Sequence, residues 1–418
     1  MEDDRLEMTG PQRMCGELLV QGLKNAALPM LAAMLLAEGV YILHHCPQIT
    51  DVDHMLELLS DAGCLTHREG HMLIVDTRGA DRCSLKGSGA GKMRAGVTLL
   101  GSILGRLHAV EIPYPGGCTI GKRPIDLHLK GLQQLGAVFE HQEHTLSGYA
   151  RKLHGADSTL DFPSVGATEN ILMAATLAEG HTVIRGAARE PEIAALAGFL
   201  QKMGAHIEGT GTSVIRVKGV ERLHAAEYIV PSDRIVAGTY LLGAVMTGGE
   251  IRLLHVPTAH LGILPHILEE LGAEVEIQTD QNGIAVKMDG KIQPVPWLAT
   301  APFPGFPTDL QSALMAALSI ASGPSILEEK IFEARFQVAP ELRKMGVGIY
   351  TEGSLAVIEG EARLHGAHVR ARELRGGAAL IMAALAAEGK TDISGMEFVK
   401  RGYEDIQGDL KKLGIVLH

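Results

Sequence analysis

Two hydrophobic patterns alternate along the chain, and each of them recurs six times. The first is a run of small apolar residues that ends in glycine, such as LAAMLLAEG at 31–39 and IMAALAAEG at 381–389. A segment that is apolar all round predicts a helix buried on every side. The glycines that end the six runs are Gly39, Gly105, Gly180, Gly249, Gly323 and Gly389.

The second pattern is an amphipathic segment, which predicts a helix with one buried and one exposed face. A glycine again follows each copy, and glycine after the last turn predicts a left-handed helix C-cap. Short β-rich runs follow both kinds of helix, for example at 40–43 and 273–277. The glycines of this second series are Gly63, Gly136, Gly204, Gly272, Gly346 and Gly414.

The two series interleave, so the chain contains six units of roughly 70 residues, each with two helices and its own strands. We expect an α/β protein of two closed domains with three units each, in which the apolar helices lie in the middle. An extended solenoid is the alternative, but units of this length carry enough apolar surface to close into compact domains. The segment 225–233, which contains Pro231, is the expected crossing between the domains.

Composition and charge exclude several classes of function. The 418 residues are 46% hydrophobic and 21% charged, and a net charge of −11 argues against a nucleic-acid partner. No apolar run reaches the roughly 18 residues of a membrane span, and the acidic N-terminus lacks the apolar core of a signal peptide. The five cysteines show neither paired nor metal-binding spacing, which predicts reduced thiols in the cytoplasm and no metal site.

A turn-rich loop at 115–128 carries the strongest chemical signal. Its glycines and two prolines allow Cys118 to be exposed, and Lys122 and Arg123 beside it would favour the thiolate. The alternative is a surface turn with an idle cysteine. The glycine-rich segment 86–92 is one residue short of a phosphate-binding P-loop and is followed by Met93, so we do not interpret it as one.

Other polar residues stand at the predicted entrances of the buried helices. Lys24 and Asn25 precede the first one, where a cation beside free N–H groups makes an anion site, although both could be ordinary surface residues. The segment 161–170 could bind a ligand or could simply cap its helix. A rigid, proline-rich turn at 301–309 delivers Asp309 to another entrance. The cations that could converge on one anionic ligand are Lys24, Arg94, Arg123, Arg335, Arg375 and Arg401.

At this point the chain resembles the enolpyruvyl transferase family, and in particular its members that act on UDP-N-acetylglucosamine. The resemblance covers essentially the whole chain. The segments that carry it are GLKNAALPMLAAMLLAEG, MRAG, PGGCTIGKRPIDLH, FPSVGATENI, REPEI, PGFPTDLQ and RGYE. It implies an inside-out α/β barrel of two domains, residues 23–230 and residues 1–22 with 231–418, with the active site in the cleft between them. It also implies that the N-terminal strand joins the second domain.

The resemblance further implies the reaction. Enolpyruvate passes from phosphoenolpyruvate to the 3-hydroxyl of UDP-N-acetylglucosamine and phosphate is released, without metal or organic cofactor, in the first committed step of peptidoglycan synthesis. The family members are monomers, and fosfomycin blocks them by alkylating the cysteine that corresponds to Cys118. Cys118 is the implied acid for the methylene carbon, and Asp309 is the implied base for the sugar hydroxyl.

The remaining site residues follow from matching the same segments. The resemblance implies phosphoenolpyruvate binding by Lys24, Asn25, Arg123 and Arg401, with Lys24 and Arg401 also counted as catalytic. It implies sugar-nucleotide binding by Asn25, Arg94, Arg123, Pro124, Ile125, Asp126, Leu127, Ser164, Val165, Asp309 and Ile331. Arg335 and Arg375 are expected as supporting cations.

The chain departs from the family pattern at Leu23, Ala334 and Val236, none of which is an expected catalytic residue. Two rival interpretations remain. One is a sister transferase that acts on shikimate 3-phosphate, although such enzymes lack a catalytic cysteine in this loop. The other is a regulatory or substrate-binding paralogue with little turnover, against which the set Lys24, Cys118, Asp309 and Arg401 argues.

Overall fold

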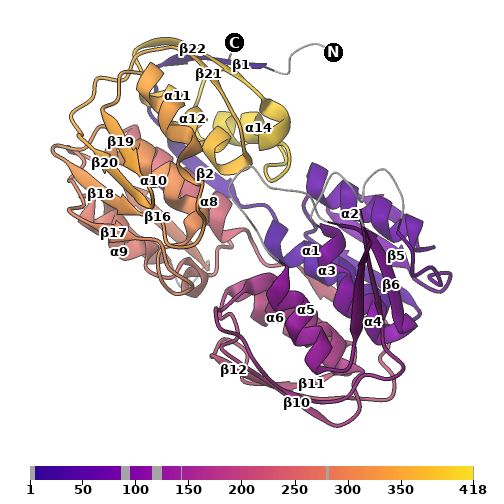
Figure 1. Ribbon diagram of the computed structural model, residues 1–418. Helices are drawn as coiled ribbons and strands as arrows, with labels where there is room; N and C mark the ends of the chain where they lie inside the picture. The colour runs from indigo at the N-terminus through magenta and orange to yellow at the C-terminus, as the bar shows by residue number, and fades with distance from the viewer. Residues whose placement is uncertain (1–4, 86–94, 115–124, 143, 279–281, 418) are drawn as a thin grey trace. The chain divides into compact units, whose positions relative to one another are not determined.

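The computed structural model describes residues 5–85, 95–114, 125–142, 144–278 and 282–417 (Figure 1). These residues form two compact units. We call residues 22–114 and 125–231 the N-terminal unit, and residues 5–21 and 232–417 the C-terminal unit. No helix of the described residues is long and apolar enough to cross a membrane.

The N-terminal unit is built around three buried helices. They are α1 (Lys24–Ala33), which continues as η1 (Met34–Leu36), α4 (Leu100–Leu107), which follows the short α3 (Ala95–Thr98), and α6 (Val165–Thr176). Every residue of α6 from Ala167 to Thr176 is buried, as its all-round apolar sequence predicts. The apolar side chains of these helices belong to one hydrophobic core.

Three small sheets and three further helices surround these buried helices. The sheets are β13-β3-β5-β4, β6-β8-β7 and β11-β12-β10-β9. The strands are β3 (Val40–His44), β4 (Leu65–Glu69), β5 (Met72–Asp76), β6 (Ala109–Pro113), β7 (Val138–Gln142), β8 (Thr145–Tyr149), β9 (Asp157–Thr159), β10 (His181–Arg185), β11 (His206–Glu208), β12 (Val214–Lys218) and β13 (Glu227–Ile229). The further helices are α2 (Thr50–Asp61), α5 (Asp126–Gln134) and α7 (Pro191–Lys202).

The C-terminal unit repeats this plan. Its central helices α8 (Arg234–Met246), α10 (Gln311–Leu318) and α12 (Leu374–Ala386) pack against one another, and all 13 residues of α8 are buried. The 3-10 turn η3 (Thr308–Leu310) leads directly into α10. The other helical segments are η2 (Thr258–Leu261), α9 (Leu264–Glu270), η4 (Phe336–Val338), α11 (Ala339–Lys344), α13 (Met396–Val399) and α14 (Ile406–Lys412).

The N-terminal segment of the chain supplies strands to two of the three sheets of this unit. β1 (Arg5–Gly10) pairs antiparallel with β22 (Gly389–Ser394), and β2 (Cys15–Leu19) pairs parallel with β14 (Glu250–Leu254). The sheets are β1-β22-β21, β15-β16-β14-β2 and β17-β18-β20-β19. The remaining strands are β15 (Glu274–Gln278), β16 (Gly283–Lys287), β17 (Leu298–Ala299), β18 (Ser325–Glu328), β19 (Ile349–Glu352), β20 (Leu355–Ile358) and β21 (His368–Arg370).

The glycine pattern is confirmed for the amphipathic helices. All six glycines of the second series have positive φ, from 80° at Gly414 to 103° at Gly63, as a left-handed C-cap requires. The first series is less regular. Gly105 lies inside α4, and His108 takes the left-handed position with a φ of 60°. A Cβ at Gly105 would lie 3.1 Å from the Leu36 side chain, so this glycine permits close helix packing instead of ending the helix.

Candidate active site

Asp309 lies at the entrance of α10 and contacts two arginines of its own unit. Its Oδ1 accepts a hydrogen bond of 2.8 Å from Arg335, and its Oδ2 accepts one of 3.0 Å from Arg375. The arginine side chains are only 3% and 5% exposed, whereas that of Asp309 is 25% exposed. One carboxylate is therefore held in a fixed orientation by two buried guanidinium groups, with part of its surface still open.

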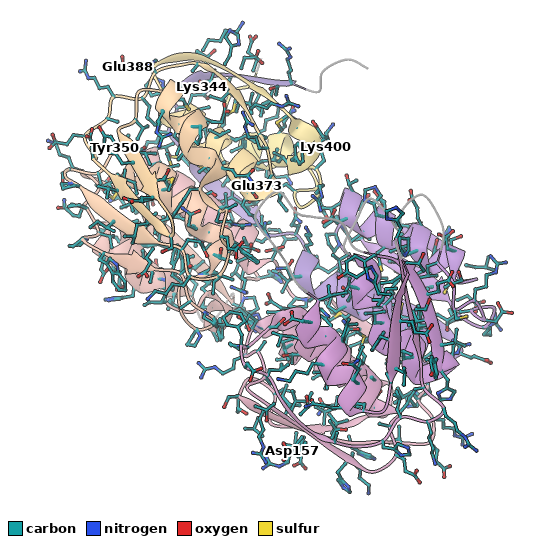
Figure 2. The ribbon with its side chains drawn as sticks, in the orientation of Figure 1. Asp157, Lys344, Tyr350, Glu373, Glu388 and Lys400 are labelled. Carbon is teal, nitrogen blue, oxygen red and sulfur yellow. The ribbon has the colours of Figure 1, made fainter. Side chains whose placement is uncertain are left out.

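The surroundings of Arg375 favour its charged form. Burial is the largest single influence on the pKa of Arg375 and would lower it, but the nearby Asp309, Tyr403 and Asp233 together outweigh burial and raise this pKa. Glu373 caps α12 by accepting from the backbone N–H groups of Arg375 and Gly376 (Figure 2 labels Glu373), and its carboxylate is 4.0 Å from Arg335. Two guanidinium groups thus face Asp309, one from the N-cap of η4 (Arg335) and one from the first turn of α12 (Arg375).

Each arginine also keeps one buried N–H group without an acceptor among the described residues. These atoms are Nε of Arg335 and Nη1 of Arg375. A buried donor without an acceptor costs free energy, and a charged one costs more than a neutral one. Such groups are uncommon in folded proteins.

Arg401 follows α13 in a tightly held loop of the same unit. The side chain of Gln21 donates to the carbonyl of Gly402 and accepts from the N–H of Glu404, both at 3.0 Å. The next side chain, Tyr403, is 1% exposed and donates to the hydroxyl of Thr239 on α8 at 2.9 Å. The loop that carries Arg401 is therefore anchored by the three residues that follow it.

Burial raises the pKa of Tyr403 to about 12, although the charge of Arg375 and the bond to Thr239 oppose the rise. The phenol is consequently neutral near pH 7 and acts as a hydrogen-bond donor. Sequence reasoning missed Tyr403, since a tyrosine in RGYE gives no sign that its hydroxyl is buried.

Lys24 is the first residue of α1 in the N-terminal unit. Its Nζ lies 2.5 Å from Oδ2 of Asp51, which stands in the first turn of α2, and the two side chains are 12% and 3% exposed. The predicted position at a helix entrance is confirmed, and Asn25 follows as the second residue of α1. The sequence alone did not reveal the buried carboxylate of Asp51.

Ser164 and Val165 occupy the entrance of α6. Ser164 is the N-cap and accepts from the N–H of Ala167 at 3.4 Å, so it does act as a helix cap. Asn170, the sixth residue of α6, accepts from the N–H of Gly101 at 2.6 Å and lies 2.9 Å from His128 of α5. The first turn of α5 contains Asp126 and Leu127, with buried Ile125 as its N-cap. These bonds join the entrances of α5 and α6.

Three glutamates lie close together beside this entrance. Glu169 is 6% exposed, and burial together with the nearby charges of Glu192 and Glu190 raises its pKa well above the usual range. The sequence analysis named none of them as a site residue. No pattern in the sequence indicates that a carboxylate on an apolar helix stands next to two others.

Several predicted site residues lie outside the described residues, namely Arg94, Cys118, Arg123 and Pro124. The structure brings Asp309, Arg335 and Arg375 together in the C-terminal unit, which also contains Arg401 and Ile331. Lys24, Asn25, Ile125, Asp126, Leu127, Ser164 and Val165 belong to the N-terminal unit. Among the described stretches of chain, no cluster of three or more His, Cys, Asp or Glu residues could hold a metal ion.

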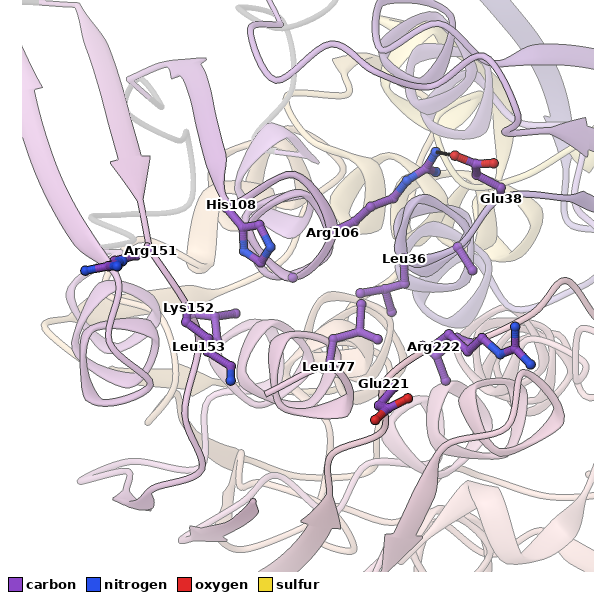
Figure 3. A pocket seen from close by; sticks show the side chains of 13 residues that line it. Leu36, Glu38, Arg106, His108, Arg151, Lys152, Leu153, Leu177, Glu221 and Arg222 are labelled. Atoms are coloured by element: carbon purple, nitrogen blue, oxygen red, sulfur yellow. Dashed lines mark hydrogen bonds and ion pairs between the residues drawn. The ribbon is translucent and has the colours of Figure 1, made fainter. Parts of the chain in front are cut away.

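A pocket of about 540 Å³ lies at the opposite ends of the central helices of the N-terminal unit (Figure 3). It is lined by residues at the C-terminal ends of η1, α4 and α6 and by the segments 151–153 and 221–223, and it contains none of the predicted site residues. Arg106 in its wall pairs with Glu38 at 3.3 Å and donates to the carbonyls of Leu35 and Thr77, so its charge serves the local structure. The predicted site residues gather instead at the helix entrances.

Comparison with known proteins identifies the family. Residues 8–410 match the family described as EPSP synthase (3-phosphoshikimate 1-carboxyvinyltransferase). The chain therefore belongs to this family, the enolpyruvyl transferases. Among solved structures, the enolpyruvyl transferase NikO from Streptomyces tendae superposes with a TM-score of 0.89 at 23% identity, covering 100% of this chain and 99% of the other. EPSP synthase from Acinetobacter baumannii gives 0.73 at 20% identity and 99% coverage of both chains, and the expected fold is confirmed.

The names of curated relatives specify a substrate as well as the family. The chain is 45% identical over 410 residues to UDP-N-acetylglucosamine 1-carboxyvinyltransferase 2 of Caldanaerobacter subterraneus, covering 98% of both chains. It is 46% identical to the protein of the same name from Carboxydothermus hydrogenoformans, again covering 98% of both. The UDP-N-acetylglucosamine 1-carboxyvinyltransferase of Synechocystis is 42% identical, covering 99% of this chain and 94% of the relative.

Proposed function

We propose that this chain transfers enolpyruvate from phosphoenolpyruvate to the 3-hydroxyl of UDP-N-acetylglucosamine and releases phosphate, as the first committed step of peptidoglycan synthesis. The full-length identity of about 45% to enzymes named for this reaction supports the substrate pair. The observation in the structure that carries the proposal is the carboxylate of Asp309 held by two buried, charged arginines. This group of three side chains combines a base with cations that can stabilise the negative charge of the substrates.

The chemistry assigns a role to each group. Asp309 takes the proton from the 3-hydroxyl of the sugar while the oxygen of that hydroxyl bonds to C2 of phosphoenolpyruvate. The acid Cys118 donates a proton to the C3 methylene. This gives a tetrahedral intermediate. Loss of a proton from C3 and departure of phosphate from C2 then restore the double bond. The cations stabilise the negative charge of phosphate and carboxylate throughout.

The binding roles follow the family. Lys24, Asn25, Arg123 and Arg401 hold phosphoenolpyruvate, and Arg335 and Arg375 support the charge near Asp309. The sugar nucleotide is held by Asn25, Arg94, Ser164, Val165, Asp309, Ile331 and the segment 123–127. The reaction needs no metal or organic cofactor, and we propose a cytoplasmic monomer.

A direct test is phosphate release from phosphoenolpyruvate, with and without UDP-N-acetylglucosamine. We expect release that depends on the sugar nucleotide and falls sharply in Cys118→Ala. Release that survives this change would keep the reaction and move the acid role to another group. If the native protein binds the sugar nucleotide but releases no phosphate, the proposal is wrong and a regulatory role is favoured.

A sister reaction with shikimate 3-phosphate is the second candidate, because the matched family carries that name and an EPSP synthase shares the fold. The 45% identity to the sugar-nucleotide enzymes favours the first candidate. Competition between the two acceptors in the same phosphate assay separates them. Turnover with shikimate 3-phosphate alone would reverse the assignment.

A further inference from the structure

Glu329 is a buried carboxylate that the reaction as proposed does not use. It follows directly after β18 and is only 4% exposed. Among the described residues, no lysine or arginine forms an ion pair with it. A buried carboxylate is costly unless its charge is compensated, so its hydrogen bonds must account for its presence.

Four donors surround this carboxylate. Oε1 accepts from the hydroxyl of Thr300 at 2.9 Å and from the backbone N–H groups of Ile331 at 2.8 Å and Phe332 at 3.1 Å. Oε2 accepts from the hydroxyl of Thr308 at 2.8 Å. These contacts use both oxygens, so both sides of the carboxylate are held by donors from the protein.

The four bonds lead to two parts of the proposed active site. Thr308 is the residue directly before the proposed base Asp309, and Ile331 is a proposed contact of the sugar nucleotide. Thr300 also accepts from the N–H of Lys330 at 2.9 Å, which ties the strand before the proline-rich turn to the same segment. Arg335, four residues after Ile331, bonds to Asp309 directly. The segment 329–335 is therefore hydrogen-bonded to the proline-rich turn at both ends of the turn, at Thr300 and at Thr308 with Asp309.

We propose that Glu329 is a positioning residue, which sets the Asp309 turn against the Ile331 backbone so that the sugar hydroxyl meets its base. This inference rests on the proposed function. The two carboxylate oxygens of Glu329 have different partners. Oε2 bonds to Thr308, next to the base, whereas Oε1 bonds to the Ile331 and Phe332 backbone and to Thr300 at the start of the turn. Small displacements matter here because transfer from a misplaced hydroxyl is strongly slowed.

Because the two oxygens of Glu329 have different partners, removing the bond to Oε2 and removing the bonds to Oε1 should have different kinetic effects. Thr308→Val removes only the bond to Oε2, so kcat should fall about tenfold while the KM for UDP-N-acetylglucosamine stays near the native value. Thr308→Ser keeps the hydroxyl and should restore kcat. Glu329→Ala removes all four bonds and should both lower kcat and raise that KM. Glu329→Gln keeps one oxygen for the Ile331 and Phe332 N–H groups, so its KM should remain near native.

Glu328→Gln is the matched control. This neighbouring carboxylate is 23% exposed and pairs with Lys330 at 3.2 Å, outside the network, so its kinetics should be unchanged. The inference is overturned if folded Thr308→Val has native kcat, or if Thr308→Ser fails to restore it. If Glu329→Ala does not fold, the two threonine variants still decide. A native protein that releases no phosphate would instead refute the proposed function itself.

Discussion

The two units place charged residues at equivalent points, the entrances of their buried helices, but they balance them differently. In the C-terminal unit, two arginines that are 3% and 5% exposed contact one carboxylate, that of Asp309. In the N-terminal unit, one ammonium contacts one carboxylate, in the Lys24–Asp51 pair. The first arrangement orients a carboxylate that is still 25% exposed, whereas the carboxylate of the second is only 3% exposed, so we expect the first to be the more sensitive in catalysis.

The largest expected effect is on turnover. Asp309→Asn keeps the size of the side chain but removes the proposed base, so kcat should fall by about 10²–10⁴. Asp51→Asn is the matched change in the other unit, and it should change kcat far less because Asp51 has no part in the proposed proton transfers. Steady-state phosphate release measures both. If the two variants lose kcat equally, the prediction that the Asp309 arrangement is the more sensitive one is wrong.

The next effect concerns stability. Lys24→Met takes the ammonium away from a carboxylate that is 3% exposed, so the free energy of unfolding in urea should drop by about 3 kcal/mol. Arg335→Met should cost less, because Asp309 is 25% exposed and keeps Arg375. If Arg335→Met lowers the free energy of unfolding more than Lys24→Met does, the contact of Asp309 with its arginines is more stabilising than the Lys24–Asp51 pair. Lys24→Arg keeps the charge and serves as the control.

A smaller effect depends on pH. Because the folded pKa of Glu169 is raised, the folded chain binds this proton more tightly than the unfolded chain. Its contribution to stability is complete below the usual pKa of 4.5 and is lost as pH rises through the folded pKa, at up to about 1.4 kcal/mol per pH unit. Glu169→Gln stays neutral, so it should remove this slope and be more stable than the native protein near pH 7. Urea unfolding at several pH values measures it, and an unchanged slope would contradict the prediction.

The smallest effects compare two helix caps. Asp233 caps α8 with bonds of 2.8 and 3.1 Å, whereas Ser164 caps α6 with a single long bond of 3.4 Å. Asp233→Ala should therefore cost about 2 kcal/mol and Ser164→Ala about 0.5 kcal/mol in thermal or urea unfolding. The reverse order would mean that the serine is held by more than its cap.

Local patterns predicted the parts of the fold that depend on neighbouring residues. The all-round apolar runs became buried helices such as α8, and all six glycines of the amphipathic series took positive φ. Gly105 shows the limit. Its place in the pattern predicted a helix end, but packing against Leu36 decided its role. Close packing between distant segments leaves no periodic signal in either of them.

The candidate site divides in the same way. Asp309, Lys24 and Ser164 were predicted because a helix entrance is visible in the sequence, and the resemblance to the transferases named their chemistry. Tyr403 and Glu329 were missed, since their partners Thr239 and Thr308 lie 164 and 21 residues away along the chain. Asp51, the partner of Lys24, was missed for the same reason.

By itself, the sequence determined the repeated α/β plan, the residues at the helix entrances and, through its relatives, the family. Those features rest on spacing and residue type, which are local properties of the chain. Only the tertiary structure decided that two arginines, from the segments before α11 and at the start of α12, meet on one carboxylate at 2.8 and 3.0 Å. It also decided that Glu169 is buried beside Glu190 and Glu192. Charge balance in a buried site depends on which distant groups share it, and only folding brings them together.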